Sequence, residues 1–118
     1  MKSEIERIVA DVKSGRTSAR AEVERALAQA RERDELHCLL EVCAEQALAR
    51  ADQLDVRIKK GEPVGRLAGV PYVAKDNFLT KVGHTTAASK MLDNFRSPID
   101  ATAIERIEAE DAVMIGKA

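Results

Sequence analysis

Two short apolar runs, separated by a long connection, constrain most strongly what this 118-residue chain can fold into. The first run, 67–74, ends abruptly at Lys75, and the second occupies residues 112–115. Both runs are typical of buried strands, and between them Asp100 is suited to cap a helix that carries Ile104. Strand, helix and strand in this order predict a βαβ unit with parallel strands. The predicted fold class is therefore α/β.

The first of these strands is expected to be covered on both faces. Pro71 is expected at its start or on an unpaired stretch, because proline has no amide for a central ladder. Upstream, the polar segment 59–66 contains two glycines and a proline and cannot continue a helix. We therefore predict an N-terminal helical region, 1–60, followed by the start of an α/β core, 61–118. That core is expected to be incomplete, because a parallel pair needs further strands and helices on both faces.

Cap residues and apolar spacing predict three helices before residue 60. An S-x-x-E capping box at Ser3–Glu6 begins the first helix, and Gly15 ends it. Thr17 or Ser18 can cap a second helix, and a third follows over 44–58. We expect the charged outer face of the second helix to lie in solvent, and its members are Arg20, Glu22, Glu24, Arg25, Arg31 and Glu32. Between the second and third helices, alternating apolar residues over 36–42 predict a short strand.

Charge and composition exclude several classes of protein. Lys plus Arg number 19 and Asp plus Glu number 20, so the net charge of −1 gives no electrostatic support for a dedicated nucleic-acid binder. No uncharged run exceeds eight residues, whereas a membrane span needs roughly 20. The N-terminus has no apolar stretch of the signal-peptide kind, so we expect a cytoplasmic protein with no membrane partner.

The cysteines and histidines are not spaced like metal ligands. Cys38 and Cys43 lie five residues apart with no histidine cluster near them, which favours two buried small hydrophobic residues over a disulfide or metal pair. His37 and His84 have no partner at metal-ligand spacing. No metal site is predicted in this chain.

Lys75 is the strongest candidate for chemistry. It stands at the carboxyl end of a predicted buried strand, where open α/β sheets place catalytic groups. Desolvation or a neighbouring cation would lower its pKa and free a neutral amine to act as a base. An equally weighted interpretation is that Lys75 ends the strand, reaches water and pairs with Asp76. Ser89 could approach Lys75 across the loop, although holding that loop by a hydrogen bond is the favoured role for this serine.

The dipeptide Gly116-Lys117 resembles the end of a phosphate-binding loop. The motif G-x-x-x-x-G-K-[ST] would require glycine at Asp111 and a hydroxyl at Ala118. Since both are absent, we reject a phosphate-loop interpretation.

Several stretches together resemble the amidase signature family. They are Leu67-Ala-Gly-Val-Pro-Tyr-Val-Ala-Lys-Asp-Asn77, Gly83-His-Thr-Thr-Ala-Ala-Ser-Lys-Met-Leu92, Asp100-Ala-Thr102 and Ile115-Gly-Lys117. Within the family, the Thr-Thr-x-Ala-Ser-Lys-Met-Leu stretch is similar to the A subunits of the glutamyl-tRNA(Gln)/aspartyl-tRNA(Asn) amidotransferases. The helical part resembles the family more loosely, at the turn 13–18. The resemblance implies N-terminal helices followed by the first βαβ part of a mixed sheet, here truncated.

The resemblance also implies a Ser, cis-Ser, Lys triad in which Lys75 is the base. Both family serines are expected downstream of this chain, so the chain alone is expected to be inactive. The likeness to the amidotransferase A subunits implies glutamine as the source of ammonia, B and C subunits as partners, and tRNA reached through the complex. ATP and Mg²⁺ are used by the intact complex, mainly at the B component, and no cofactor is expected in this chain.

Alternative functions are a general amidase that acts on small amides and a non-catalytic, truncated interaction module. Family members usually have glycine at the position of Asp111 and threonine at that of Ala118. An aspartate tolerates the left-handed conformation of a helix end, so we expect the first of these departures to be mild.

Overall fold

In the computed structural model, which describes residues 1–118, the first two helices begin at predicted caps, and the first ends at its predicted glycine. Helix α1 spans Glu4–Ser14, and the Ser3 hydroxyl accepts from the Glu6 amide while the Glu6 carboxylate accepts from the Ser3 amide. Gly15 ends this helix in the left-handed conformation, at φ 81°. Helix α2 spans Ala19–Glu32 and is capped by Ser18. The capping predictions are therefore confirmed.

Two further α-helices and two 3₁₀ turns complete the helical part: α3 (Ala44–Lys59), α4 (Thr102–Ala109), η1 (Asp34–Leu36) and η2 (Lys90–Leu92). The prediction that Asp100 caps α4 is wrong. Ala101 occupies the cap position without a side-chain bond, and the Asp100 carboxylate accepts from the Lys81 amide at 2.7 Å. The carboxylate satisfies a loop amide distant in sequence instead of its own helix.

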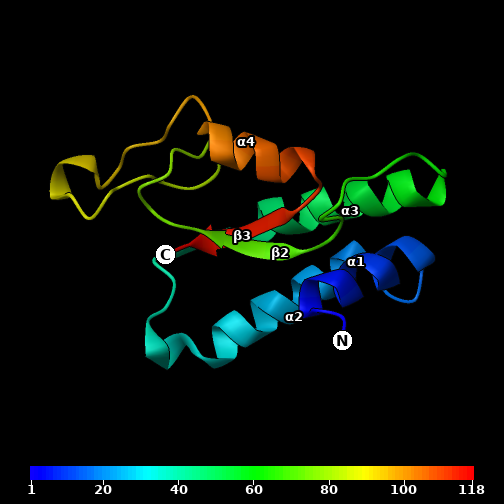
Figure 1. Ribbon diagram of the computed structural model, residues 1–118. Helices are drawn as coiled ribbons and strands as arrows, with labels where there is room; N and C mark the ends of the chain where they lie inside the picture. The colour runs from blue at the N-terminus through cyan, green and yellow to red at the C-terminus, as the bar shows by residue number, and fades with distance from the viewer.

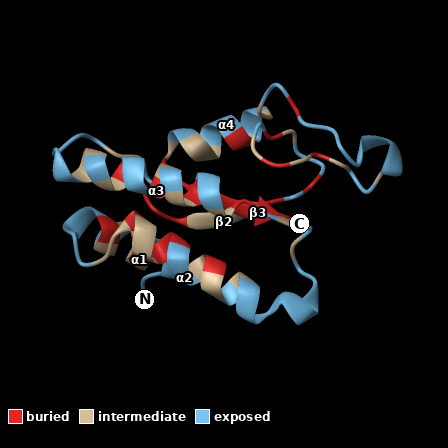
Figure 2. Cartoon of the chain, turned by 180° about the vertical axis from the view of Figure 1, so that it is seen from behind, coloured by how far each residue is buried: buried red, intermediate tan, exposed pale blue.

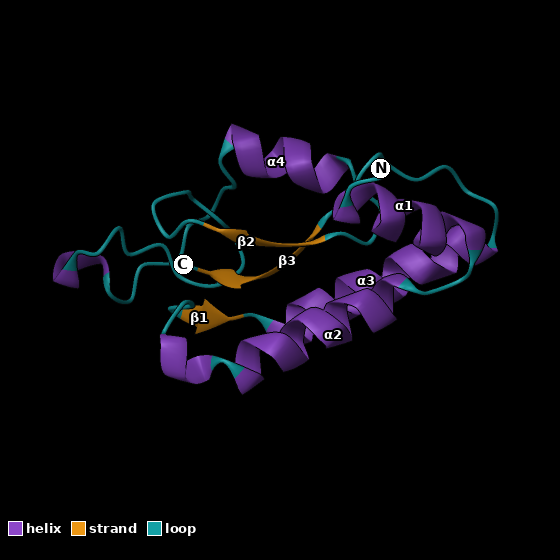
Figure 3. Cartoon of the chain, turned by 60° about the horizontal axis from the view of Figure 1, so that its bottom comes forward, coloured by secondary structure: helices purple, strands orange, loops and turns teal.

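The sheet has three strands in the order β1-β3-β2 (Figure 3). Strand β3 (Val113–Lys117) runs parallel to β2 (Pro71–Ala74) and antiparallel to β1 (Glu41–Val42). The α/β class and the parallel pair are confirmed, with Pro71 at the start of its strand. The strand predicted over 36–42 is reduced to its last two residues, because His37 adopts a left-handed conformation at φ 50° that breaks the extension.

The core lies on both faces of β3 (Figures 1 and 2). Val113 and Ile115 pack into a cluster with apolar residues of α1, α2 and α3, whereas Met114 packs with Ile104 of α4 on the other face. This alternation follows from the two-residue period of a strand. Each such side chain contributes roughly 1.5–3 kcal/mol when fully buried. The cluster draws residues from both predicted regions, and the division at residue 60 stays a prediction.

Three side chains differ in burial from what the sequence predicts. Val73 is exposed near the end of the edge strand β2, where it lines a hollow with Ile115 and residues of α2. Glu22 is only 3% exposed and accepts from Arg25 at 2.9 Å, so the prediction of a solvated charge is wrong there. Both cysteines are free, but only Cys43 is buried, and burial raises the pKa of its thiol. Cys38 is exposed because it follows the η1 turn at the surface.

Asp111 links the end of α4 to the segment that enters β2. Its backbone is left-handed, at φ 65°, which confirms that an aspartate is accommodated at this position. Its carboxylate accepts from Arg57 at 2.7 and 3.2 Å and from the Gly65 amide at 2.8 Å. Gly65 must be glycine, because a Cβ there would lie 2.3 Å from the backbone of Glu110.

Replacing Asp111 by alanine should lower the free energy of unfolding by about 2–4 kcal/mol, since a left-handed alanine is strained and charged hydrogen bonds are lost. Asp111→Gly removes the same hydrogen bonds but relieves the backbone, so its loss should be smaller by about 1 kcal/mol. Urea denaturation of the two variants measures the difference. Equal losses would show that the left-handed backbone contributes nothing.

Candidate functional site

Lys75 follows β2 directly, at the carboxyl end of the parallel pair. Its neighbours are held by the end of β3, since the Ala118 amide donates to the Ala74 carbonyl at 2.9 Å and the Ala118 carbonyl accepts from the Asp76 amide at 2.6 Å. The Lys75 carbonyl accepts from the Phe78 amide at 3.0 Å, which closes a tight turn. The backbone of Lys75 is thus fixed on both sides.

The Lys75 side chain is exposed and makes no hydrogen bond or ion pair within the chain. It therefore reaches water, but the pairing with Asp76 is not formed. Ser89 holds the loop through its backbone, which donates to the Thr86 carbonyl at 2.8 Å. The Ser89 hydroxyl has no hydrogen bond to Lys75, so the structure does not couple these two side chains.

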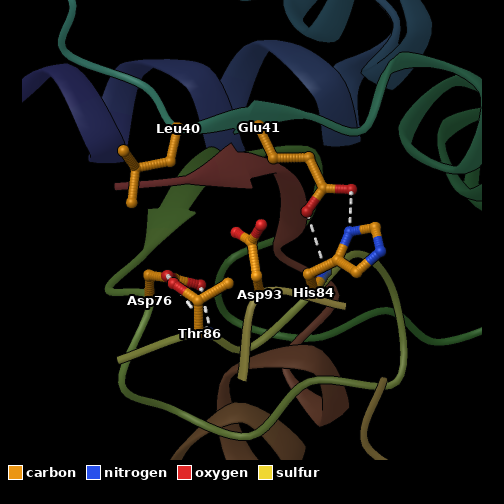
Figure 4. A pocket seen from close by; sticks show the side chains of 6 residues that line it. All are labelled: Leu40, Glu41, Asp76, His84, Thr86 and Asp93. Atoms are coloured by element: carbon orange, nitrogen blue, oxygen red, sulfur yellow. Dashed lines mark hydrogen bonds and ion pairs between the residues drawn. The ribbon is translucent and has the colours of Figure 1, made fainter. Parts of the chain in front are cut away.

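Asp76 is buried beside the exposed lysine and organises the loop that returns past it. Its carboxylate accepts from the amide of Thr86 at 3.3 Å and from the Thr86 hydroxyl (Figure 4). Its carbonyl accepts from the Ala87 amide at 3.1 Å. One aspartate therefore ties residues ten and eleven positions downstream to the end of β2.

Lys117 supplies the positive charge that faces this loop. Its side chain is completely buried, and its ammonium lies 3.8 Å from the Asp76 carboxylate. The three N–H groups of the ammonium are shared among four neutral oxygens: Thr80 Oγ1 at 2.8 Å, the His84 carbonyl at 3.0 Å, the Phe78 carbonyl at 3.2 Å and Thr85 Oγ1 at 3.3 Å. Burial lowers the pKa of Lys117, and the Asp76 carboxylate partly offsets this effect.

Sequence reasoning assigned no role to Lys117, because it treated Gly116-Lys117 as an incomplete phosphate loop and as part of the family resemblance. The structure gives the glycine a different reason, since a Cβ at Gly116 would lie 2.4 Å from the carbonyl oxygen of Glu41 in β1. The available signal was the position of Lys117 at the end of an apolar strand. A lysine there is either exposed at the strand end or buried with partners.

A pocket of about 380 Å³ opens next to Asp76 (Figure 4). Its lining residues are Leu40, Glu41, Asp76, His84, Thr86 and Asp93. The Glu41 carboxylate accepts from the His84 amide at 2.7 Å, and its second oxygen lies 3.1 Å from His84 Nδ1. These two contacts join the loop at His84 to Glu41 of β1. No group of three or more His, Cys, Asp or Glu side chains is arranged to hold a metal ion.

No helix of the chain has both the length and the apolar content that crossing a membrane requires.

The geometry defines a mixed α/β protein with a lysine and a braced polar loop at the carboxyl end of a parallel strand. A family model described as Amidase matches residues 21–118. The chain belongs to the amidase signature family.

Curated relatives of this chain are A subunits of glutamyl-tRNA(Gln) amidotransferases. The one from Chlamydia abortus is 48% identical over 86 residues, which are 73% of this chain and 18% of that protein. An A subunit of Clostridium acetobutylicum, the one numbered 2, is 46% identical over 87 residues, 74% of this chain and 18% of that protein. The chain thus spans less than a fifth of the length of these relatives.

Solved structures of the family share the fold over almost the whole chain. Peptide amidase of Stenotrophomonas maltophilia superimposes with a TM-score of 0.90 at 27% identity, covering 98% of this chain and 24% of that one. A vestigial protein complex linked to the origins of an s-triazine catabolic enzyme gives a TM-score of 0.92 at 36% identity, with 98% and 26% covered. The predicted first part of an amidase-signature fold is confirmed.

Asp76→Ala should destabilise the chain by about 2–4 kcal/mol, because it strips the Thr86 amide of its acceptor and leaves the buried Lys117 ammonium without a carboxylate nearby. Urea denaturation measures the loss. The matched control is Asp93→Ala, an exposed aspartate of the same pocket, for which we expect a change within about 0.5 kcal/mol. Similar losses in the two variants would contradict the bracing role of Asp76.

Proposed function

We propose that this chain forms the N-terminal part of a glutamine-hydrolysing A subunit of a tRNA-dependent amidotransferase, in which Lys75 is the base. The observation that carries the proposal is the placement of Lys75, fixed in backbone and free in side chain, at the carboxyl end of β2. The names of the relatives support the choice of enzyme, because those at 45–50% identity are glutamyl-tRNA(Gln) amidotransferase A subunits.

In the proposed reaction, a neutral Lys75 amine takes a proton through a bridging serine from a second, nucleophilic serine. The nucleophile forms an ester with the side-chain carbonyl carbon of glutamine, and the carbon–nitrogen bond breaks to release ammonia. Water then hydrolyses the ester to glutamate and restores the serine. The proton removed by Lys75 leaves with the departing ammonia, so acid and base balance within the cycle.

Neither serine of this triad is assigned to a residue of this chain. Its five serines are Ser3, Ser14, Ser18, Ser89 and Ser97, and none of them has a hydrogen bond to Lys75. A lysine that acts as a base is also held away from water, whereas the Lys75 side chain is exposed. On this proposal, the two serines and the cover over the Lys75 amine come from parts of the protein other than residues 1–118.

Ammonia released in this way would pass to a partner that amidates glutamate or aspartate attached to tRNA. We propose the amidotransferase B and C subunits as the partners, with ATP and Mg²⁺ acting at the B component. The acidic side chains of this chain do not form a cluster that fits Mg²⁺, so no step of that activation is assigned to its residues. We also propose a cytoplasmic location, in keeping with a role in protein synthesis.

A general amidase is the second candidate, and the structural likeness to peptide amidase and to a bacterial aryl acylamidase favours it. The base would be the same lysine, but the substrate would be a small or peptide amide and no tRNA partner would be needed. A non-catalytic interaction module is the third candidate, for which the exposed apolar residues of β2 and its surroundings are the relevant feature.

The base role of Lys75 can be tested in a chimera that replaces the matching 86 residues of the Chlamydia abortus protein with those of this chain. The chimera should hydrolyse glutamine, and Lys75→Met should lower kcat by about 10²- to 10⁴-fold, the usual contribution of a general base. Ammonia release measures the rate. Lys81→Met, which removes an exposed lysine of the following loop, is the matched control and should retain the rate.

The same chimera separates the candidate functions. With the B and C subunits and ATP, it should convert Glu-tRNA(Gln) or Asp-tRNA(Asn) to the amidated form at the expense of glutamine. Efficient hydrolysis of peptide amides without any transamidation would instead support the general amidase. Full glutamine hydrolysis by the Lys75→Met chimera would exclude Lys75 as the base.

The 118-residue chain alone should release no ammonia from glutamine, because Lys75 has no serine partner within it. A coupled glutamate dehydrogenase assay on the purified chain measures this. Ammonia release that Lys75→Ala abolishes would show that the chain contains a complete site.

A further inference from the structure

Lys117 is a costly residue at its position. Its ammonium is completely buried, and the nearest carboxylate oxygen, on Asp76, is 3.8 Å away. Transfer of an ammonium out of water is strongly unfavourable unless the charge is paired and its donors are satisfied. A methionine would fill a similar volume without that cost, so packing alone does not account for a lysine here.

The four oxygens that receive the ammonium come from both ends of one loop. Phe78 and Thr80 lie on the outgoing side, shortly after Lys75, and His84 and Thr85 lie on the returning side. Secondary contacts reinforce the arrangement, because Thr85 Oγ1 also donates to the Phe78 carbonyl at 3.2 Å. A single ammonium therefore closes the loop over residues 78–85.

This closure reaches Lys75 through two short connections. The Phe78 residue whose carbonyl binds Lys117 also donates its amide to the Lys75 carbonyl at 3.0 Å. Asp76, next to Lys75, faces the same ammonium and holds the returning side of the loop through Thr86. Movement of the ammonium would therefore be transmitted to both sides of the Lys75 backbone.

We propose that Lys117 is a positioning residue that fixes the loop carrying Lys75, and this inference rests on the proposed function only for the role of Lys75 as a base. Lys117 is not itself suited to be that base. Its donors are all engaged with loop oxygens, and its burial by the chain leaves no open approach for a substrate.

Amide exchange of the 118-residue chain, followed by ¹⁵N NMR, tests the positioning role. In Lys117→Met, the amides of Thr86 and Ala87 should exchange about 10-fold faster or more, because charged hydrogen bonds to the loop are lost. The amides of Cys43 and Val113, which donate to the carbonyls of Ile115 and Val70, should be much less affected. The Lys81→Met control should leave all four amides unchanged.

The pH dependence of the NMR signals distinguishes a charged side chain at position 117 from one that only fills space. The signals of Phe78 and Thr85 should titrate with Lys117, at a midpoint below the ordinary lysine value. The transition should vanish in Lys117→Met and persist in Lys81→Met. The other charged or titratable groups that act on the ammonium belong to surrounding elements, and they are Asp76, Glu41, Cys43 and Asp100. His84, whose carbonyl binds the ammonium, also carries a titratable imidazole in this loop.

The sign of the stability effect follows from the lowered pKa of Lys117. Between that pKa and the ordinary value near 10.4, the unfolded chain binds more protons than the folded one. The stability of the natural chain relative to Lys117→Met should therefore rise with pH across this window. A fall, or no change, would contradict a pKa of Lys117 that lies below the ordinary lysine value in the folded chain.

Thr80→Val is a second variant, which tests the positioning role of Lys117 even if Lys117→Met does not fold. It removes the nearest acceptor of the ammonium while preserving volume, so it should accelerate exchange of the loop and lower the titration midpoint of Lys117 further. Unchanged loop exchange in both variants, or equal acceleration in loop and core, would overturn the positioning role. Because none of these readouts involves catalysis, their failure is distinguishable from failure of Lys75 as a base in the chimera.

Discussion

The central strand β3 is the constraint on which the rest of the structure depends. All five of its residues are buried, it pairs with both other strands, and its two faces contact the helix cluster and α4. Pairing with β2 sets the register in which Ala74 faces Lys117, and this register places Lys75 beyond the end of the ladder. The same strand supplies Gly116, whose missing side chain lets β1 approach. One strand therefore determines the sheet order and the position of the lysine loop.

Local signals in the sequence were sufficient where a structure is formed by neighbouring residues. The capping box at Ser3, the stop at Gly15 and the apolar stripe of α3 act within a few residues, and each was predicted correctly. The parallel pair followed from two apolar runs and the length of their connection. Asp100 and Glu22 were predicted wrongly because their partners or surroundings are set by tertiary contacts, such as the Lys81 amide that donates to Asp100.

The candidate site was predictable only in part for the same reason. Lys75 could be found from the abrupt end of an apolar strand and from the family resemblance. The partners of Lys117 could not, because its oxygens lie 32 to 39 residues away and two of them are backbone carbonyls that any sequence would provide. The burial of a charged side chain by such groups becomes visible only once the loop is folded.

The two lysines at this end of the sheet, Lys75 and Lys117, differ in burial and in the accessibility of the amine. Lys117 has burial and a lowered pKa, but its ammonium is saturated with loop oxygens and has no free access. Lys75 has a fixed backbone and a free amine, but water still surrounds that amine. A base needs access and desolvation together. On the proposed function, residues 1–118 therefore determine where the base stands, and covering Lys75 with further structure determines when it can lose its proton.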